Sequence, residues 1–197
     1  MLLYTMTNEE AYKEMSLDKD WLTGRVKGLS LKYNKKMREY AKKKQANMFL
    51  GLSKYKTPRG NEAFILCYTG VSIYHIRMAF FFRVSSGSKT KVMLLDFMHR
   101  EISVFTDHFI SRWQERNPKD DNHLFKFLDE ISLSGVIAYG ENTNEGTMAI
   151  NNGLCFLSIE GNATIFKTFV SNDLLGENQK ELVQRLKERT QVYRLLG

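Results

Sequence analysis

The order of patterns along this 197-residue chain predicts an α+β fold, in which a mainly antiparallel sheet is flanked by helices and follows an N-terminal basic helical segment. Apolar residues recur at helical spacing near the N-terminus, and runs rich in Ile, Phe, Tyr and Val follow, several of them joined by short turns that contain Gly. The regular alternation of strands and helices that is typical of a parallel sheet is missing. We expect residues 1–50 to form the basic helical segment and residues 51–197 the α+β domain on which it packs.

The N-terminal segment is expected to be mostly helical over residues 7–47. Thr7 and Glu10 have the spacing of a capping box, in which each residue satisfies a backbone N–H of the other. A second helix start lies near residues 16–20. After it, apolar residues recur every three or four positions and form one stripe, which consists of Leu22, Val26, Leu29, Tyr33, Met37 and Tyr40.

The strands are predicted from runs of β-branched and aromatic residues between turn signals. The expected strands are residues 62–69, 71–85, 90–97, 101–105, 136–139 or 147–150, 154–159 and 163–170. Turns are expected at residues 58–61, 85–88, 151–153 and 160–162, each of which contains Gly. Further helices are expected near His108, over residues 122–133, and after a cap at Ser171 or Asn172.

The composition excludes several classes of protein. Cys67 and Cys155 lie inside apolar runs, as buried thiols of a reducing compartment do. No Cys/His spacing of a zinc site, nucleotide-binding loop or pair of metal-binding acids is present, so we expect no metal and no cofactor. A secretory leader and an apolar run long enough to span a membrane are also missing, which predicts a cytoplasmic protein without membrane contact.

Positive charge is concentrated in one window of the chain. Residues 19–44 contain ten Lys and Arg residues and two acids, a net charge of +8, whereas the whole chain carries +7. This asymmetry favours RNA or another polyanion, or an acidic protein, as the partner. The candidate nucleic-acid-binding residues here are Lys35, Lys36, Lys42, Lys43 and Lys44. The alternative interpretation is a helix that packs on the sheet and simply keeps its lysines in solvent.

The candidate catalytic residues lie on the helix that follows strand 101–105. His108, Arg112 and Arg116 are four residues apart and therefore share one helical face. At a helix start the backbone dipole disfavours a protonated imidazole, so His108 could act as a general base, and the two arginines could hold a phosphate. Such groups suit metal-free cleavage of RNA through its 2′-hydroxyl. The alternative is a solvated face in which the arginines pair with nearby acids such as Glu115 or Glu101.

A second candidate segment is the strand around residues 165–171. Strand alternation would place Lys167, Phe169 and Ser171 on one face and Phe166, Thr168 and Val170 on the other. Thr168 is a candidate catalytic residue, and Lys167 and Ser171 are candidate contacts to nucleic acid. A strand interior with mixed faces is the alternative interpretation.

These motifs together resemble small bacterial ribonuclease-toxin domains of the barnase–EndoU–RelE group. The resemblance rests on Thr-x-His-Phe-x-x-Arg-x-x-x-Arg after a strand and on Lys-Thr-Phe-Val-Ser at the end of a meander, and it covers about residues 53–172. It implies a metal-independent endoribonuclease with His108, Arg112, Arg116 and Thr168 at its site. This chain departs from the pattern in its extra basic helix and its C-terminal helix, so the alternatives are a non-catalytic nucleic-acid-binding protein and a protein-interaction module that uses the basic helix.

Overall fold

The computed structural model describes residues 1–42, 49–69, 76–96, 99–116, 136–139, 144–150 and 152–196. The chain divides into two compact units. The first comprises residues 1–104 and 161–163, and the second comprises residues 105–160 and 164–197. The fold is α+β and its sheet is mainly antiparallel, as the sequence predicts. The predicted helix over residues 122–133 lies outside the described residues.

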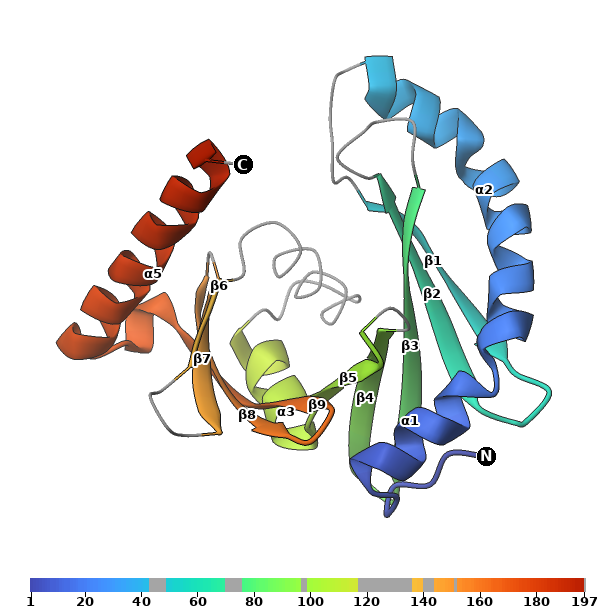
Figure 1. The fold of residues 1–197 in the computed structure, drawn as a ribbon, viewed down its shortest axis with the longest axis horizontal. Helices are drawn as coiled ribbons and strands as arrows, with labels where there is room; N and C mark the ends of the chain where they lie inside the picture. The colour runs from blue at the N-terminus through green and yellow to red at the C-terminus, as the bar shows by residue number, and fades with distance from the viewer. Residues whose placement is uncertain are drawn as a thin grey trace. The chain divides into compact units, whose positions relative to one another are not determined.

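Two helices open the first unit, α1 (Asn8–Ser16) and α2 (Lys19–Lys42). The predicted capping box starts α1: the Glu10 N–H donates to Thr7 Oγ1 (3.3 Å), and the Thr7 N–H donates to Glu10 Oε2 (2.8 Å). Leu17 and Asp18 separate the two helices. Figure 1 shows both helices along one side of the strands of this unit, with α2 running the length of β1 and β2.

The strands of the first unit follow one another in chain order, as in a meander. They are β1 (Phe49–Lys56), β2 (Glu62–Thr69), β3 (Ile76–Ser86), β4 (Lys89–Asp96) and β5 (Glu101–Phe105). β1 pairs antiparallel with β2, β2 with β3, and β3 with β4. The predicted turns between β1 and β2 and between β3 and β4 are confirmed, and Gly60 and Gly87 adopt there the positive φ of +81° and +59°.

The sequence patterns did not predict β1. Its residues are mixed in character, and its strand conformation comes from pairing with β2, for example Leu52 opposite Leu66. Gly51 explains how α2 approaches this strand. A Cβ atom at Gly51 would lie 2.2 Å from the Tyr33 hydroxyl oxygen, so only glycine leaves room for that ring.

The described residues of the second unit form four strands with helices on both sides. The strands, in their order across the sheet, are β9 (Ala163–Ser171), β8 (Gly153–Glu160), β7 (Glu145–Ile150) and β6 (Val136–Tyr139). Both alternatives for the strand after residue 135 are therefore strands. α3 (Asp107–Arg116) and α5 (Glu177–Leu196) lie on opposite sides of these strands (Figure 1).

Aromatic rings fill the space between α3 and β9. Phe105 stacks on Phe166 at 4.8 Å between ring centroids, Phe109 meets the same ring at 5.7 Å, and Trp113 meets Phe169 at 4.7 Å. All five side chains are buried. On the α5 side the core is aliphatic and consists of Ala149, Leu154, Leu175, Val183 and Leu186.

The predicted cap of the last helix at Ser171 or Asn172 is wrong. Residues 172–174 form a short 3₁₀ turn, and Ser171 makes no side-chain capping bond to it. Leu175 is then extended and 5% exposed in the aliphatic core, which delays the start of α5. The helix begins after Gly176, whose carbonyl accepts hydrogen bonds from the backbone N–H groups of Gln179 and Lys180, both at 3.0 Å.

Candidate nucleic-acid interface

α2 has one buried and one exposed face. Along the predicted apolar stripe, Leu22, Leu29 and Tyr33 are buried, and Val26, Met37 and Tyr40 are half-buried. Contacts of the helix with β1, β2 and β3 bury this stripe. The prediction that the stripe faces the sheet is therefore confirmed. Its burial fixes which side chains of α2 point outward.

Four exposed cations lie on the outward face of α2, at positions that share a side of the helix. We call this set the basic row; it consists of Lys27, Lys35, Arg38 and Lys42. The row spans sixteen residues, from Lys27 to Lys42, so its ends are about 22 Å apart along the helix axis. The helix contains two acids, Asp20 and Glu39, and both are exposed. Within the described part of the chain, no ion pair ties any cation of the row to a carboxylate.

Three other cations of α2, Arg25, Lys32 and Lys36, lie near aromatic rings of the same helix. The Arg25 guanidinium lies 4.6 Å from the centre of the Trp21 ring, and the Lys32 and Lys36 ammonium groups lie 5.2 and 5.8 Å from the centres of Tyr33 and Tyr40. Lys36 also donates to the Leu50 carbonyl in β1 at 2.9 Å. Of the predicted nucleic-acid contacts on this segment, Lys35 and Lys42 therefore belong to the basic row, whereas Lys36 is turned toward β1. Lys43 and Lys44 lie outside the described residues.

The predicted catalytic helix begins where the sequence places it. Thr106 caps α3, because its Oγ1 accepts a hydrogen bond of 3.2 Å from the Phe109 N–H. The same hydroxyl donates to the backbone carbonyls of Phe166 and Lys167, at 3.1 and 3.2 Å. This places His108 in the first turn, where its side chain is exposed.

Both arginines of α3 are engaged within the protein. Arg112 pairs with Glu115 at 2.9 Å, as in the alternative interpretation of this helix. Arg116 Nη1 donates to the Phe169 carbonyl in β9. The pKa of Asp173 is lowered, chiefly by a hydrogen bond from Ser171 and in smaller part by Arg116. Arg116 thus joins α3 to the strand.

The predicted alternation of β9 is not followed. Phe166 and Phe169 would lie on opposite faces of a regular strand, yet both pack against rings of α3. The same two residues also have their backbone carbonyls bound from α3 and its cap, Phe166 by Thr106 and Phe169 by Arg116, so this stretch of β9 faces the helix. Of the other predicted residues, Lys167 is exposed and pairs with Glu145 at 3.0 Å, and Thr168 and Ser171 are half-buried.

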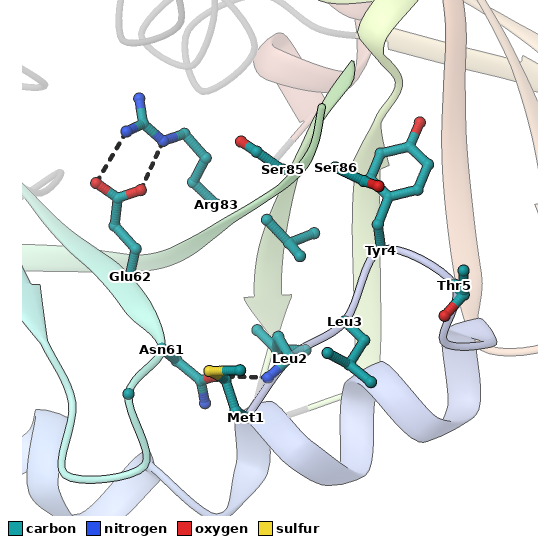
Figure 2. A pocket seen from close by; sticks show the side chains of 12 residues that line it. Met1, Leu2, Leu3, Tyr4, Thr5, Asn61, Glu62, Arg83, Ser85 and Ser86 are labelled. Carbon is teal, nitrogen blue, oxygen red and sulfur yellow. Dashed lines mark hydrogen bonds and ion pairs between the residues drawn. The ribbon is translucent and has the colours of Figure 1, made fainter. Parts of the chain in front are cut away.

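A hollow of about 410 Å³ opens in the first unit, between residues 1–5 and the adjacent ends of β2 and β3. Figure 2 shows Arg83 and Glu62 paired on its wall; their two hydrogen bonds measure 2.7 and 3.0 Å. The lining residues also include Ser85 and Ser86, but they contain no His, Cys or Lys. Arg83 and Glu62 pair with each other and the Met1 amine pairs with Glu14, so these charged groups of the wall are already engaged within the protein.

A buried polar cluster beside this hollow was not predicted. Asn61 Nδ2 donates to Asp18 at 2.7 Å, and Asn61 Oδ1 accepts from the Leu2 N–H at 2.6 Å. Asp18 and Asn61 are 1% and 2% exposed. These bonds join segments more than forty residues apart, so no local sequence pattern could reveal them. They hold the corner between α1 and α2 on the β1–β2 turn.

Among the described residues, no group of three or more His, Cys, Asp or Glu side chains is placed to hold a metal ion. No helix in that part of the chain is long and apolar enough to cross a membrane. No family model, curated protein or solved structure matches the chain.

Proposed function

We propose that this protein binds nucleic acid through the basic row of α2. The observation that carries the proposal is that these four cations have no carboxylate partner among the residues that the structure describes, while the opposite face of the helix is packed on β1, β2 and β3. A cation that is already paired gains little from a phosphate, whereas an unpaired one displaces condensed counterions from the nucleic acid. The buried stripe keeps the helix fixed, so its charges are presented together.

This mechanism has a measurable consequence in salt. A protein that neutralises four phosphates of a duplex gives a slope of about −3.6 in a plot of log affinity against log salt concentration. Between 50 and 200 mM salt the affinity should therefore fall by about 100-fold. A weaker dependence would indicate fewer phosphate contacts.

The test is a fluorescence anisotropy titration of a labelled nucleic acid with wild type and a variant in which all four residues of the basic row are replaced by Gln. The matched control replaces four other exposed cations by Gln: Lys13, Lys56, Lys89 and Lys180. Both variants lose the same net charge. The proposal expects a large loss of affinity for the first variant and a small one for the control. Equal losses, or no binding by wild type at low salt, would refute it.

The second candidate function is cleavage of bound RNA, and the exposed His108 on the face shared with Arg112 is the observation that favours it. In this proposal His108 is the general base or acid, and the guanidinium groups contact the phosphate after release from their present partners. General acid–base catalysis contributes about 10²–10⁴-fold. His108→Ala should therefore reduce cleavage by about that factor while RNA affinity is kept. RNA that stays intact with wild type, with and without divalent cations, would contradict the proposal.

An acidic protein is the alternative partner for the basic row. The same four-residue variant tests this alternative, because it should lose affinity for such a protein. In that case affinity would follow the acidic protein, and wild type would not bind nucleic acid at low salt.

A further inference from the structure

We infer that the nucleic acid held by the basic row is a duplex, contacted through its phosphates and not through its bases. This inference rests on the proposed function and goes further, because it names the form of the ligand. It depends on the cations of the outward face of α2 and on the lack of exposed aromatic rings among the described residues.

Proteins that bind single strands combine positive charge with aromatic side chains on which the bases stack. In the part of the chain that the structure describes, every aromatic side chain with an assigned exposure is buried or half-buried. The large exposed apolar side chains there are instead Met1, Leu3, Leu17, Leu31 and Leu174. The described surface therefore presents its cations without a fully exposed Phe, Tyr or Trp ring on which a base could stack.

The aromatic rings of α2 already contact other side chains of the protein. Trp21 meets Tyr55 edge to face at 5.8 Å and has the Arg25 guanidinium over its own ring. Tyr33 is 9% exposed, and Tyr40 has the Lys36 ammonium group beside it. A base could stack on these rings only by displacing a cation of the same helix. The aromatic residues of α2 are thus part of the packing and not of the interface.

Three residues beside the cations of the row cannot read base edges. Gly24, just before the row, and Gly28 and Leu31, within it, occupy this outward face, and Leu31 is 72% exposed. No heavy atom outside the helix backbone lies within 4 Å of a Cβ built on either glycine. None of these three positions offers a hydrogen-bonding side chain to a base edge. The cations of the row are therefore the groups that a duplex meets on this stretch of the face, and the phosphates of the duplex carry the charge that attracts them.

The placement of the row on one packed helix also favours a duplex. The cations project from about 22 Å of a single helix. A duplex presents phosphates that are already fixed and dense, with one charge for each ~1.7 Å of axis. A single strand has a lower charge density and must lose conformational freedom to follow the row.

The test compares, in equal salt, two 20-base-pair duplexes of unrelated sequence with their four component single strands. We expect wild type to bind either duplex about tenfold or more tightly than its single strands, and to bind the two duplexes with affinities within about threefold of each other. The four-residue variant of the basic row should lose this binding. A duplex RNA probe is included to show whether the affinity differs between ribose and deoxyribose backbones.

Intrinsic tryptophan fluorescence gives an independent readout, because the chain has two Trp residues and Trp113 is 1% exposed. We expect no stacking-type quenching of Trp21 when a duplex binds. Tighter binding of single strands, with quenching of Trp21, would overturn the duplex inference and leave the proposed function standing. Strong preference for one duplex sequence would overturn phosphate-only contact. Absence of binding to every probe would instead refute the proposed function.

Discussion

The Arg59 guanidinium binds both carboxylate oxygens of Glu14, with hydrogen bonds of 3.0 Å from Nε and 2.7 Å from Nη2. The N-terminal amine of Met1 lies 2.5 Å from the same carboxylate, and Asn61 Nδ2 donates to it at 3.3 Å. Glu14 is 8% exposed. This carboxylate therefore ties α1 to the β1–β2 turn and to the chain start.

Glu14→Gln should destabilise the first unit by about 2–3 kcal/mol, because the neutral amide leaves the cations of this cluster without their charge partner. The measurement is the free energy of unfolding from denaturant titration at neutral pH. Glu9→Gln is the matched control on the same helix, since Glu9 forms an exposed pair with Lys13 and should change the free energy by less than about 0.5 kcal/mol. Equal effects of the two substitutions would contradict this role of Glu14.

The same carboxylate should make stability depend on acid pH. The hydrogen bond from Arg59, opposed by burial and aided by the N-terminal amine and Asn61, lowers the pKa of Glu14 from 4.5 to about 2. The unfolded chain thus binds this proton at a higher pH than the folded chain does. The stabilisation is complete above pH 4.5 and is lost as the pH falls toward 2.

Between pH 6 and pH 3 this carboxylate should account for a loss of about 2 kcal/mol in the free energy of unfolding. Other groups titrate in the same range, so the quantity to measure is the difference between wild type and Glu14→Gln at each pH. The difference should shrink on acidification. A difference that is constant over this range would show that Glu14 is not held by its partners.

Replacing Arg116 should reduce the free energy of unfolding more than replacing Arg112, the other arginine of α3. Arg116→Ala leaves the Phe169 carbonyl without its donor and should cost about 1–3 kcal/mol. Arg112→Ala removes an exposed pair with Glu115 and should change stability by less than about 0.5 kcal/mol. Denaturant unfolding of both variants measures this. A larger cost for Arg112 than for Arg116 would contradict the described packing of α3.

Two glycines should respond in opposite directions to replacement by alanine. At Gly153 a Cβ atom would lie 2.1 Å from the Val170 carbonyl oxygen and 2.8 Å from the Phe169 ring, so Gly153→Ala should destabilise by about 1–3 kcal/mol or more. Gly24 lies in α2 with no atom in reach of its Cβ, and Gly24→Ala should stabilise by about 1 kcal/mol. Thermal unfolding of both variants measures this. A neutral effect of Gly153→Ala would contradict the close approach of β8 and β9 at this position.

The parts of the fold that the sequence predicts correctly are those with local causes. The Thr7–Glu10 box, the apolar stripe of α2 and the hairpin at Gly87 depend on residues a few positions apart. β1 could not be predicted, because its own residues are mixed in character and its strand conformation comes from pairing with β2. The start of α5 was misplaced because burial of Leu175 overrides the capping preference of Ser171.

The candidate sites show the same difference between features with local causes and features that depend on distant parts of the chain. The shared face of His108, Arg112 and Arg116 could be predicted from helical spacing. The partner of Arg116 could not, because it is a backbone carbonyl 53 residues away. The cations of α2 were visible in the sequence, yet only the packed structure separates Lys36, which is bound to Leu50, from Lys35, which faces outward.

The salt dependence of duplex affinity, measured by anisotropy for wild type and for the four-residue variant of the basic row, decides whether α2 is the interface. We expect a log–log slope of about −3.6 for wild type, a slope near zero for the variant, and a nearly wild-type slope for the charge-matched control. A variant with the wild-type slope and affinity would show that α2 is not the interface.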